Sequence, residues 1–200
     1  MDIISISFGF AVDVPAIANA IENAYVQGII ILASASNEGA NERIAFPARL
    51  KNVFCIGAAD GKGYDAGFNP PYVGMEKYSA LGDSVSGADV QKTKPTSSQH
   101  STISRRSGTS TATPIAAGIA ANFLEYTRQF LKPGKGPENS ARIKKLFLEM
   151  SKATVTLPYR FLVPWSLFKP NLDPSQTRES IREILRRSAC TIPPLALGLT

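Results

Sequence analysis

The heptapeptide Gly-Thr-Ser-Thr-Ala-Thr-Pro at residues 108–114 constrains this chain more than any other segment, because it places a serine where a helix begins. Residues 115–130 predict that helix from apolar side chains at helical spacing, namely Ile115, Ile119, Phe123 and Tyr126. Ser110 would then lie at the helix N-terminus, where unpaired N–H groups and the positive end of the helix dipole favour negative charge. Pro114 fits the first turn, where no internal N–H bond is lost. The segment predicts a nucleophilic serine beside an oxyanion-binding site.

The residues before this serine alternate between helix and strand patterns. Residues 29–39, Ile-Ile-Ile-Leu-Ala-Ser-Ala-Ser-Asn-Glu-Gly, indicate a buried strand that leads into a loop, and residues 53–58 indicate another core strand. A helix closed by Gly28 is predicted between the chain start and the first of these strands. Its apolar positions are Val14, Ile17, Ile21 and Ala24. The alternation predicts an α/β fold with a mainly parallel sheet in three α/β/α layers.

Three segments together resemble the subtilisin-like serine peptidases (subtilases) over about residues 1–130. The heptapeptide matches the family's Gly-Thr-Ser-x-Ala-x-Pro, and residues 29–39 are similar to its Ala-Ala-Gly-Asn-x-Gly segment. The first match consists of Gly108, Thr109, Ser110, Ala112 and Pro114. The resemblance makes Ser110 the nucleophile and Asn37 a donor to the oxyanion. Without the serine segment, Asn37 would be interpreted as an ordinary turn asparagine.

The first nine residues are similar to the family's strand that ends in Ser-Leu-Gly or Ser-Phe-Gly. In the family, this strand runs beside the substrate backbone and forms one wall of the pocket for the residue before the cleaved bond. The residues that the resemblance assigns to the two walls are Ser7, Phe8, Gly9, Ser34, Ala35 and Ser36. Because Ser36 stands where the family usually has glycine, we expect a narrow pocket that prefers small or medium side chains.

The mechanism implied by the resemblance also needs a histidine base and an aspartate that orients it. Both precede the Ser-Phe-Gly strand in the family, and this chain begins at that strand, so the resemblance implies a domain that is incomplete at its N-terminal side. The only histidine, His100, lies in the polar stretch Thr96 to Ser104, which is typical of a surface loop. We interpret His100 as a solvated loop residue rather than a general base.

Two hypotheses follow from the missing histidine and aspartate. The chain is either the C-terminal part of a longer serine endopeptidase with its triad Asp and His upstream, or an inactive peptidase-like module that binds extended peptides or acts as an interaction domain. The first is favoured, because loss of the upstream half would leave sheet edges bare. We expect the 200-residue chain alone to be inactive.

The charged residues are distributed unevenly along the chain. Residues 1–131 carry 10 Lys or Arg against 11 Asp or Glu, whereas residues 132–200 carry 12 against 5. We predict a partial peptidase domain over 1–131 and a basic C-terminal extension over 132–200, with a Pro/Gly-rich linker and two short helices. The first helix, about Ser140 to Met150, is expected to pack on the domain through Ile143, Leu146, Phe147 and Met150.

The second predicted helix follows Asp173-Pro174 and carries several arginines. They are Arg178, Arg182, Arg186 and Arg187. No aromatic residues lie between them, so a solvated face is favoured over a nucleic-acid site. A peptide or protein substrate is the expected partner, and the sequence does not predict an oligomeric state.

No apolar run approaches the length of a membrane span, and no signal segment opens the sequence. Because Cys55 lies in a predicted core strand and Cys190 in the tail, no disulfide framework is predicted, and an intracellular location is favoured. No metal or other cofactor is predicted. Calcium is frequent in the family that the chain resembles, but its ligands there are backbone carbonyls or lie upstream.

Overall fold

The computed structural model describes residues 1–71, 76–89, 102–132, 134, 136–153, 159–169 and 171–187. His100 and Cys190 lie outside the described residues. No helix in the described part of the chain is both long and apolar enough to span a membrane.

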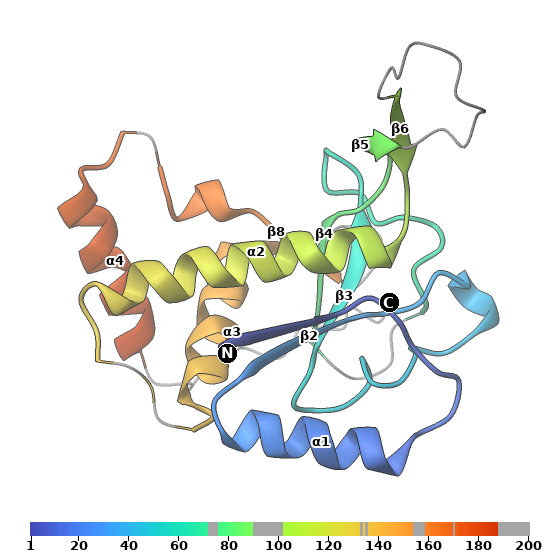
Figure 1. Ribbon diagram of the computed structural model, residues 1–200. Helices are drawn as coiled ribbons and strands as arrows, with labels where there is room; N and C mark the ends of the chain where they lie inside the picture. The colour runs from blue at the N-terminus through green and yellow to red at the C-terminus, as the bar shows by residue number, and fades with distance from the viewer. Residues whose placement is uncertain are drawn as a thin grey trace, which may run out of the picture.

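A six-stranded sheet with the order β1-β2-β3-β4-β8-β7 forms the centre of the molecule (Figure 1). The strands are β1 (Ile3–Ile6), β2 (Ile30–Ser34), β3 (Phe54–Ala59), β4 (Lys77–Leu81), β7 (Ser151–Ala153) and β8 (Tyr159–Leu162). All neighbours pair in parallel except β7 with β8. Every residue of β2 and β3 is buried, as expected for parallel strands covered on both faces. The predicted α/β fold with a mainly parallel sheet is confirmed.

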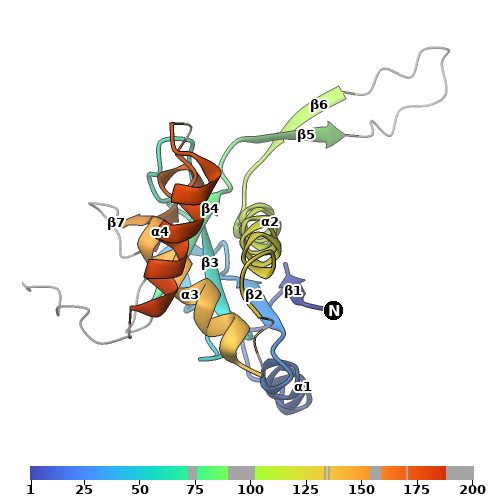
Figure 2. The ribbon, with the colours of Figure 1, turned by 90° about the vertical axis from the view of Figure 1, so that its left-hand side faces the viewer.

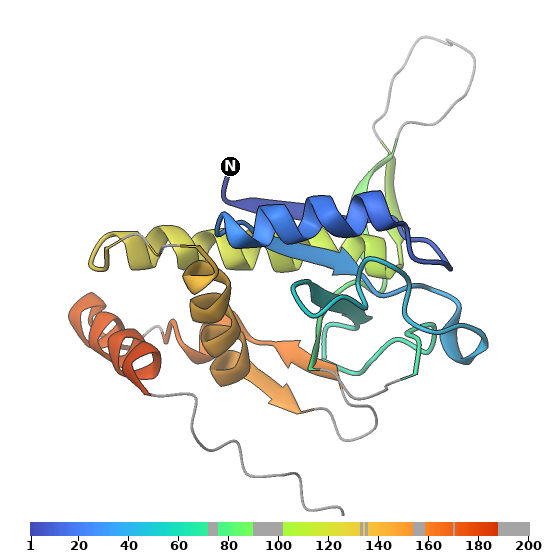
Figure 3. The ribbon, with the colours of Figure 1, turned by 90° about the horizontal axis from the view of Figure 1, so that it is seen from below.

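The described part of the chain contains four α-helices; the first three pack on the two faces of the sheet, and the fourth packs on the third. They are α1 (Pro15–Val26), α2 (Thr109–Arg128), α3 (Glu138–Met150) and α4 (Pro174–Arg186). β1 and β2 run between α1 and α2 (Figures 1 and 3). Ile31 and Ala33 pack with Ile21 of α1, whereas Ile30 and Leu32 pack in the cluster that contains α2 and α3. Because neighbouring side chains of a strand point to opposite faces, this split confirms the three-layer α/β/α arrangement.

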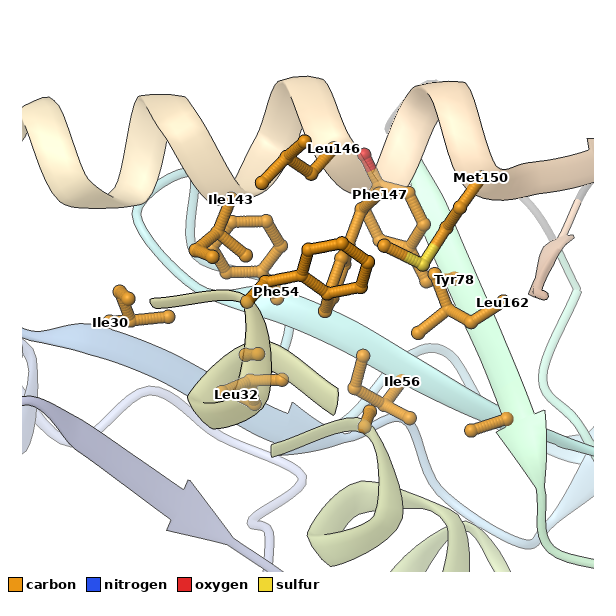
Figure 4. Packing of buried hydrophobic residues seen from close by; sticks show 14 of the residues in the cluster. Ile30, Leu32, Phe54, Ile56, Tyr78, Ile143, Leu146, Phe147, Met150 and Leu162 are labelled. Carbon is orange, nitrogen blue, oxygen red and sulfur yellow. The ribbon is translucent and has the colours of Figure 1, made fainter. Parts of the chain in front are cut away.

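Helix α3 and strands β7 and β8 lie beyond residue 131, yet they belong to the same sheet and core. Phe147 of α3 packs against Phe54 and Tyr78, with ring centroids 5.5 and 5.2 Å apart (Figure 4). The apolar face of α3 is no more than 1% exposed at Ile143, Leu146, Phe147 and Met150. The division of the chain at residue 131 stays a prediction about domain organisation, but it does not mark an end of the sheet.

Helix α4 begins at Pro174, and its capping box joins the Asp173 backbone N–H to Gln176 Oε1 at 3.2 Å. Its basic side chains have partners within the described residues. The Arg178 and Arg182 guanidinium groups lie 5.7 and 5.0 Å from the Phe130 ring centroid. Arg182, Arg186 and Arg187 form ion pairs with Glu179 or Glu183.

Strands β5 (Val85–Asp89) and β6 (Thr102–Arg106) form a separate antiparallel ribbon that stands away from the main sheet (Figure 2). The prediction of a surface loop through residue 104 is wrong at its end, since residues 102–104 belong to β6. The sequence there is polar, and backbone pairing with β5 rather than burial makes it a strand.

Replacing Phe147 with alanine should lower the free energy of unfolding by about 3–5 kcal/mol, because it leaves a cavity against Phe54 and Tyr78. Urea denaturation followed by circular dichroism measures the loss. Glu149→Ala, an exposed position on the same helix, is the matched control and should change stability by less than about 0.5 kcal/mol. Equal stability of the two variants would contradict the packing of α3 on the sheet.

Candidate active site

The carboxyl ends of three parallel strands bring together segments that are far apart in the sequence. Ser7 follows β1, Asn37 follows β2, and Gly82 follows β4. The N-terminus of α2 lies against all three segments through hydrogen bonds from or to residues 108–110. Ligand sites of open α/β sheets form at this edge, because the strand ends and helix starts meet there.

Gly108 holds the backbone just before the serine helix. Its N–H donates to the Gly82 carbonyl at 2.8 Å, and its φ of +156° is a conformation that residues with a side chain rarely adopt. The next N–H, from Thr109, donates to Asn37 Oδ1 at 2.8 Å. This bond fixes the orientation of the Asn37 amide, so that Oδ1 is engaged and the Nδ2 hydrogens can donate elsewhere.

Two hydrogen-bond donors approach the space beside Gly108. A Cβ atom at Gly108 would lie 3.4 Å from Asn37 Nδ2 and 3.8 Å from the Ser110 backbone nitrogen. Within the described residues, no acceptor is found for the Ser110 N–H. Both donors lie at the positive end of α2, where the resemblance to the family leads us to expect an oxyanion.

Ser110 and Ser7 are joined by two reciprocal hydrogen bonds. Ser110 Oγ donates to the Ser7 carbonyl at 3.2 Å, and Ser7 Oγ donates to the Ser110 carbonyl at 3.0 Å. The second bond has a clear cause, since the helical partner of the Ser110 carbonyl would be the N–H of residue 114, which is proline. The prediction that Pro114 lies in the first turn is wrong, because α2 begins at Thr109 and Pro114 is its sixth residue.

The residues predicted to line the substrate pocket occupy two different environments. Ser7, Phe8 and Gly9 are exposed after β1, and Phe8 keeps 57% of its surface accessible. Ser34 and Ala35 are buried at the end of β2. A Cβ atom at Gly9 would lie 2.6 Å from that of Ala45, so glycine allows the close approach of this loop. The two segments thus differ in exposure, and the pocket between them stays a prediction.

Ser36 has the backbone conformation that glycine adopts most readily. Its φ is +139°, an unfavourable value for a residue with a side chain. Its Oγ accepts a hydrogen bond from the Glu38 N–H at 3.3 Å. The loop therefore keeps the geometry of a glycine-containing sequence although a serine is present.

The sequence did not reveal a polar cluster that supports the segment before Gly108. Ser107 Oγ donates to Asp83 Oδ1 at 2.7 Å and accepts from the Ser84 N–H at 2.9 Å. Ser84 itself has a positive φ of 55°. The cluster ties the end of β6 to the turn after β4, directly beside the start of α2. In the sequence, the only signal for this cluster is that Ser107 directly precedes the heptapeptide 108–114.

Histidine is absent from the described residues, and they contain no group of three or more His, Cys, Asp or Glu side chains that could hold a metal ion. The described part of the chain therefore brings Ser110 and Asn37 together, but it contains no histidine that could take the proton of the serine.

Known proteins resemble this chain in both sequence and fold. The profile of the Subtilase family matches residues 1–156. Subtilisin DY from Bacillus licheniformis is 33% identical over 127 residues, which cover 62% of this chain and 43% of that protein. M-protease from Shouchella clausii is 34% identical over 121 residues, which cover 60% of this chain and 29% of that protein. The chain thus spans less than half the length of these curated relatives.

Solved protease structures share the fold. The protease domain of PatA superimposes with a TM-score of 0.64 at 24% identity, covering 90% of this chain and 60% of that one. The prenylagaramide maturation protease PagA gives a TM-score of 0.66 at 22% identity, covering 90% and 62%. Since the family profile covers most of the chain and the fold agrees, the chain belongs to the subtilase family of serine peptidases.

Proposed function

We propose that this chain is the serine-bearing part of a subtilisin-type endopeptidase. Ser110 attacks the scissile carbonyl, and Asn37 Nδ2 and the Ser110 N–H donate to the oxyanion that forms. The observation that carries this proposal is the hydrogen bond of 2.8 Å from the Thr109 N–H to Asn37 Oδ1, which holds the Asn37 amide against the start of α2, beside the Ser110 N–H. Peptides and proteins are the substrates.

The proton of the Ser110 hydroxyl needs an acceptor. The hydroxyl donates to the Ser7 carbonyl, which cannot act as a base at neutral pH. We assign this role to a histidine, oriented by an aspartate, in a segment that precedes this sequence in a longer protein. The described sheet supports this assignment, since β1 pairs only with β2 and its other edge can accept a further strand beside Ser7.

An inactive module that binds extended peptides is the alternative, and the Ser110–Ser7 hydrogen bond favours it in the chain as given. Sequencing the full-length transcript across its 5′ end separates the two. An in-frame extension with an aspartate at a strand end and a histidine at a helix start supports the peptidase. A translation start confirmed at Met1, together with no labelling by a fluorophosphonate, supports the binding module instead.

Ser36→Gly in the extended enzyme should increase cleavage after phenylalanine relative to alanine by about tenfold, because removing the hydroxymethyl group widens the predicted pocket. The measurement is the ratio of kcat/KM for two peptides that differ only at the residue before the cleaved bond. Ala40→Gly, an exposed position in the following turn, is the control and should leave the ratio unchanged. Equal cleavage after Phe and Ala by the unmodified enzyme would refute the narrow pocket.

A further inference from the structure

The β5–β6 ribbon begins and ends beside the start of the serine helix. The Gly108 N–H donates to the Gly82 carbonyl at 2.8 Å, and the Ser84 N–H donates to Ser107 Oγ at 2.9 Å. In the sequence, the ribbon lies between the two partners of each bond, and it stands away from the main sheet at the end of α2 that carries Ser110 (Figures 1 and 2). The base of the ribbon is therefore fixed to the backbone that holds Ser110.

Two adjacent arginines lie at the base of this ribbon. Arg105 and Arg106 are the last two residues of β6, and Arg106 pairs with Val85, the first residue of β5. Both arginines are exposed. Because Arg105 precedes Ser110 by only five positions, their Cα atoms are at most about 18 Å apart. An extended peptide covers that distance in about five residues.

The ribbon presents a guanidinium group on each of its faces. Neighbouring side chains of a strand point to opposite faces, so Arg105 lies on one face and Arg106 on the other. The Arg105 face is open, since Ile103 on the same face is 78% exposed and Ser86, which pairs with Arg105, is also exposed. In the part of the chain that the structure describes, the Arg105 guanidinium has no hydrogen-bond or ion-pair partner. A peptide on either face therefore meets an accessible positive charge.

The ribbon occupies a flank of the site that the predicted pocket does not use. The segments assigned to the residue before the cleaved bond, 7–9 and 34–36, follow β1 and β2. The ribbon follows β4, which lies on the other side of β3 in the sheet. The two flanks of Ser110 are thus formed by different elements, and only the flank with the ribbon carries an adjacent pair of arginines within the described residues.

We propose that the ribbon contacts the part of the substrate that follows the cleaved bond, and that its arginines select an acidic side chain there. The inference rests on the proposed function, because it needs Ser110 to be the nucleophile. A carboxylate accepts hydrogen bonds from the planar guanidinium group, a pairing that suits arginine better than lysine. The favoured substrates are peptides with an aspartate or glutamate within about five positions after the cleaved bond.

One carboxylate at the base of the ribbon limits where the acidic residue binds. Asp83 Oδ1 accepts a hydrogen bond from Ser107 Oγ at 2.7 Å, close to the start of α2. Its negative charge repels an acidic side chain directly beside the cleaved bond. Since Arg105 and Arg106 lie farther along β6, the preference for an acidic residue should be weakest at the first position after the bond.

The test compares peptide substrates of the extended enzyme. All peptides carry alanine before the cleaved bond, and in each pair a glutamate replaces a glutamine of similar shape at one position after it. At one or more of these positions, kcat/KM should be about fivefold higher for the Glu peptide at low ionic strength, as for an exposed ion pair. The ratio should approach one at about 1 M salt, because salt screens exposed charges.

Variants assign the preference to the ribbon. Replacing both Arg105 and Arg106 with glutamine should abolish the preference for Glu and leave cleavage of the Gln peptides unchanged. The matched control replaces Arg186 and Arg187, an adjacent exposed pair at the end of α4, with glutamine, and it should keep the preference. Replacing Arg105 and Arg106 with glutamate should invert it, so that a Lys peptide is cleaved faster than a Glu peptide. A merely structural role of the arginines would not produce this inversion.

Failure of this inference can be told apart from failure of the proposed function. If the extended enzyme cleaves the Glu and Gln peptides equally well at every position, the peptidase assignment stands and the role of the arginines is overturned. The same conclusion follows if the double glutamine variant keeps the preference. If the extended protein cleaves no peptide and is not labelled by a fluorophosphonate, the proposed function fails, and this inference fails with it.

Discussion

Replacing Ser110 with alanine should abolish peptide cleavage and fluorophosphonate labelling in the protein that carries the upstream aspartate and histidine. The variant lacks the nucleophile but keeps the Asn37 and backbone donors, so substrate can still bind while no acyl-enzyme forms. The value of kcat should fall by a factor on the order of a million, which is the loss known for removing the nucleophile of subtilisin, a member of the same family.

The control for this experiment is a second serine outside the site. Ser180 is exposed on α4, and its Oγ donates to the Gln176 carbonyl at 2.9 Å. Ser180→Ala should therefore retain full cleavage and full labelling, with the label attached to the peptide that contains Ser110. Labelling that persists in Ser110→Ala would discard the nucleophile assignment, and labelling lost in both variants would point to a fault in folding.

The central fold could be predicted from the sequence because its signals are local. β2 and β3 are continuous apolar runs, and the apolar spacing of α1 and α3 matches one buried face of a helix. β8 gave no such signal. Its four residues, Tyr-Arg-Phe-Leu, form a strand that pairs with β7 on one side and, on the other, with β4, which lies far away in the sequence. Pairing of this kind depends on tertiary contacts rather than on local propensity.

The candidate site was predictable to a similar extent. The motifs identified Ser110 and Asn37, and the structure brings their segments together through the bond from the Thr109 N–H to Asn37 Oδ1. The sequence could not reveal that Ser7 replaces the hydrogen bond that Pro114 removes from the helix. To predict this bond, one must know which backbone carbonyl lies beside which hydroxyl group in the folded chain. The spacing of residues in the sequence does not give this information.

Asn37 offers a sharper test of the oxyanion site, because its two amide atoms have separate roles. Oδ1 accepts from the Thr109 N–H at 2.8 Å, while Nδ2 lies near the space beside Gly108. Asn37→Ala in the extended enzyme removes both atoms and should lower kcat by about a hundred- to a thousandfold, with a smaller change in KM. This range is the one known for the oxyanion asparagine of subtilisin.

Asn37→Asp separates the two roles. The aspartate keeps an oxygen that can accept from Thr109, so the start of α2 and the stability of the chain should be preserved. It replaces the Nδ2 donor with a carboxylate oxygen that repels the oxyanion, so kcat should fall at least as far as in Asn37→Ala. Asn41→Ala, at an exposed position in the same loop region, should leave kcat unchanged. If Asn37 served only to anchor Thr109, the aspartate variant would turn over substrate normally, and the proposed role of Nδ2 would be wrong.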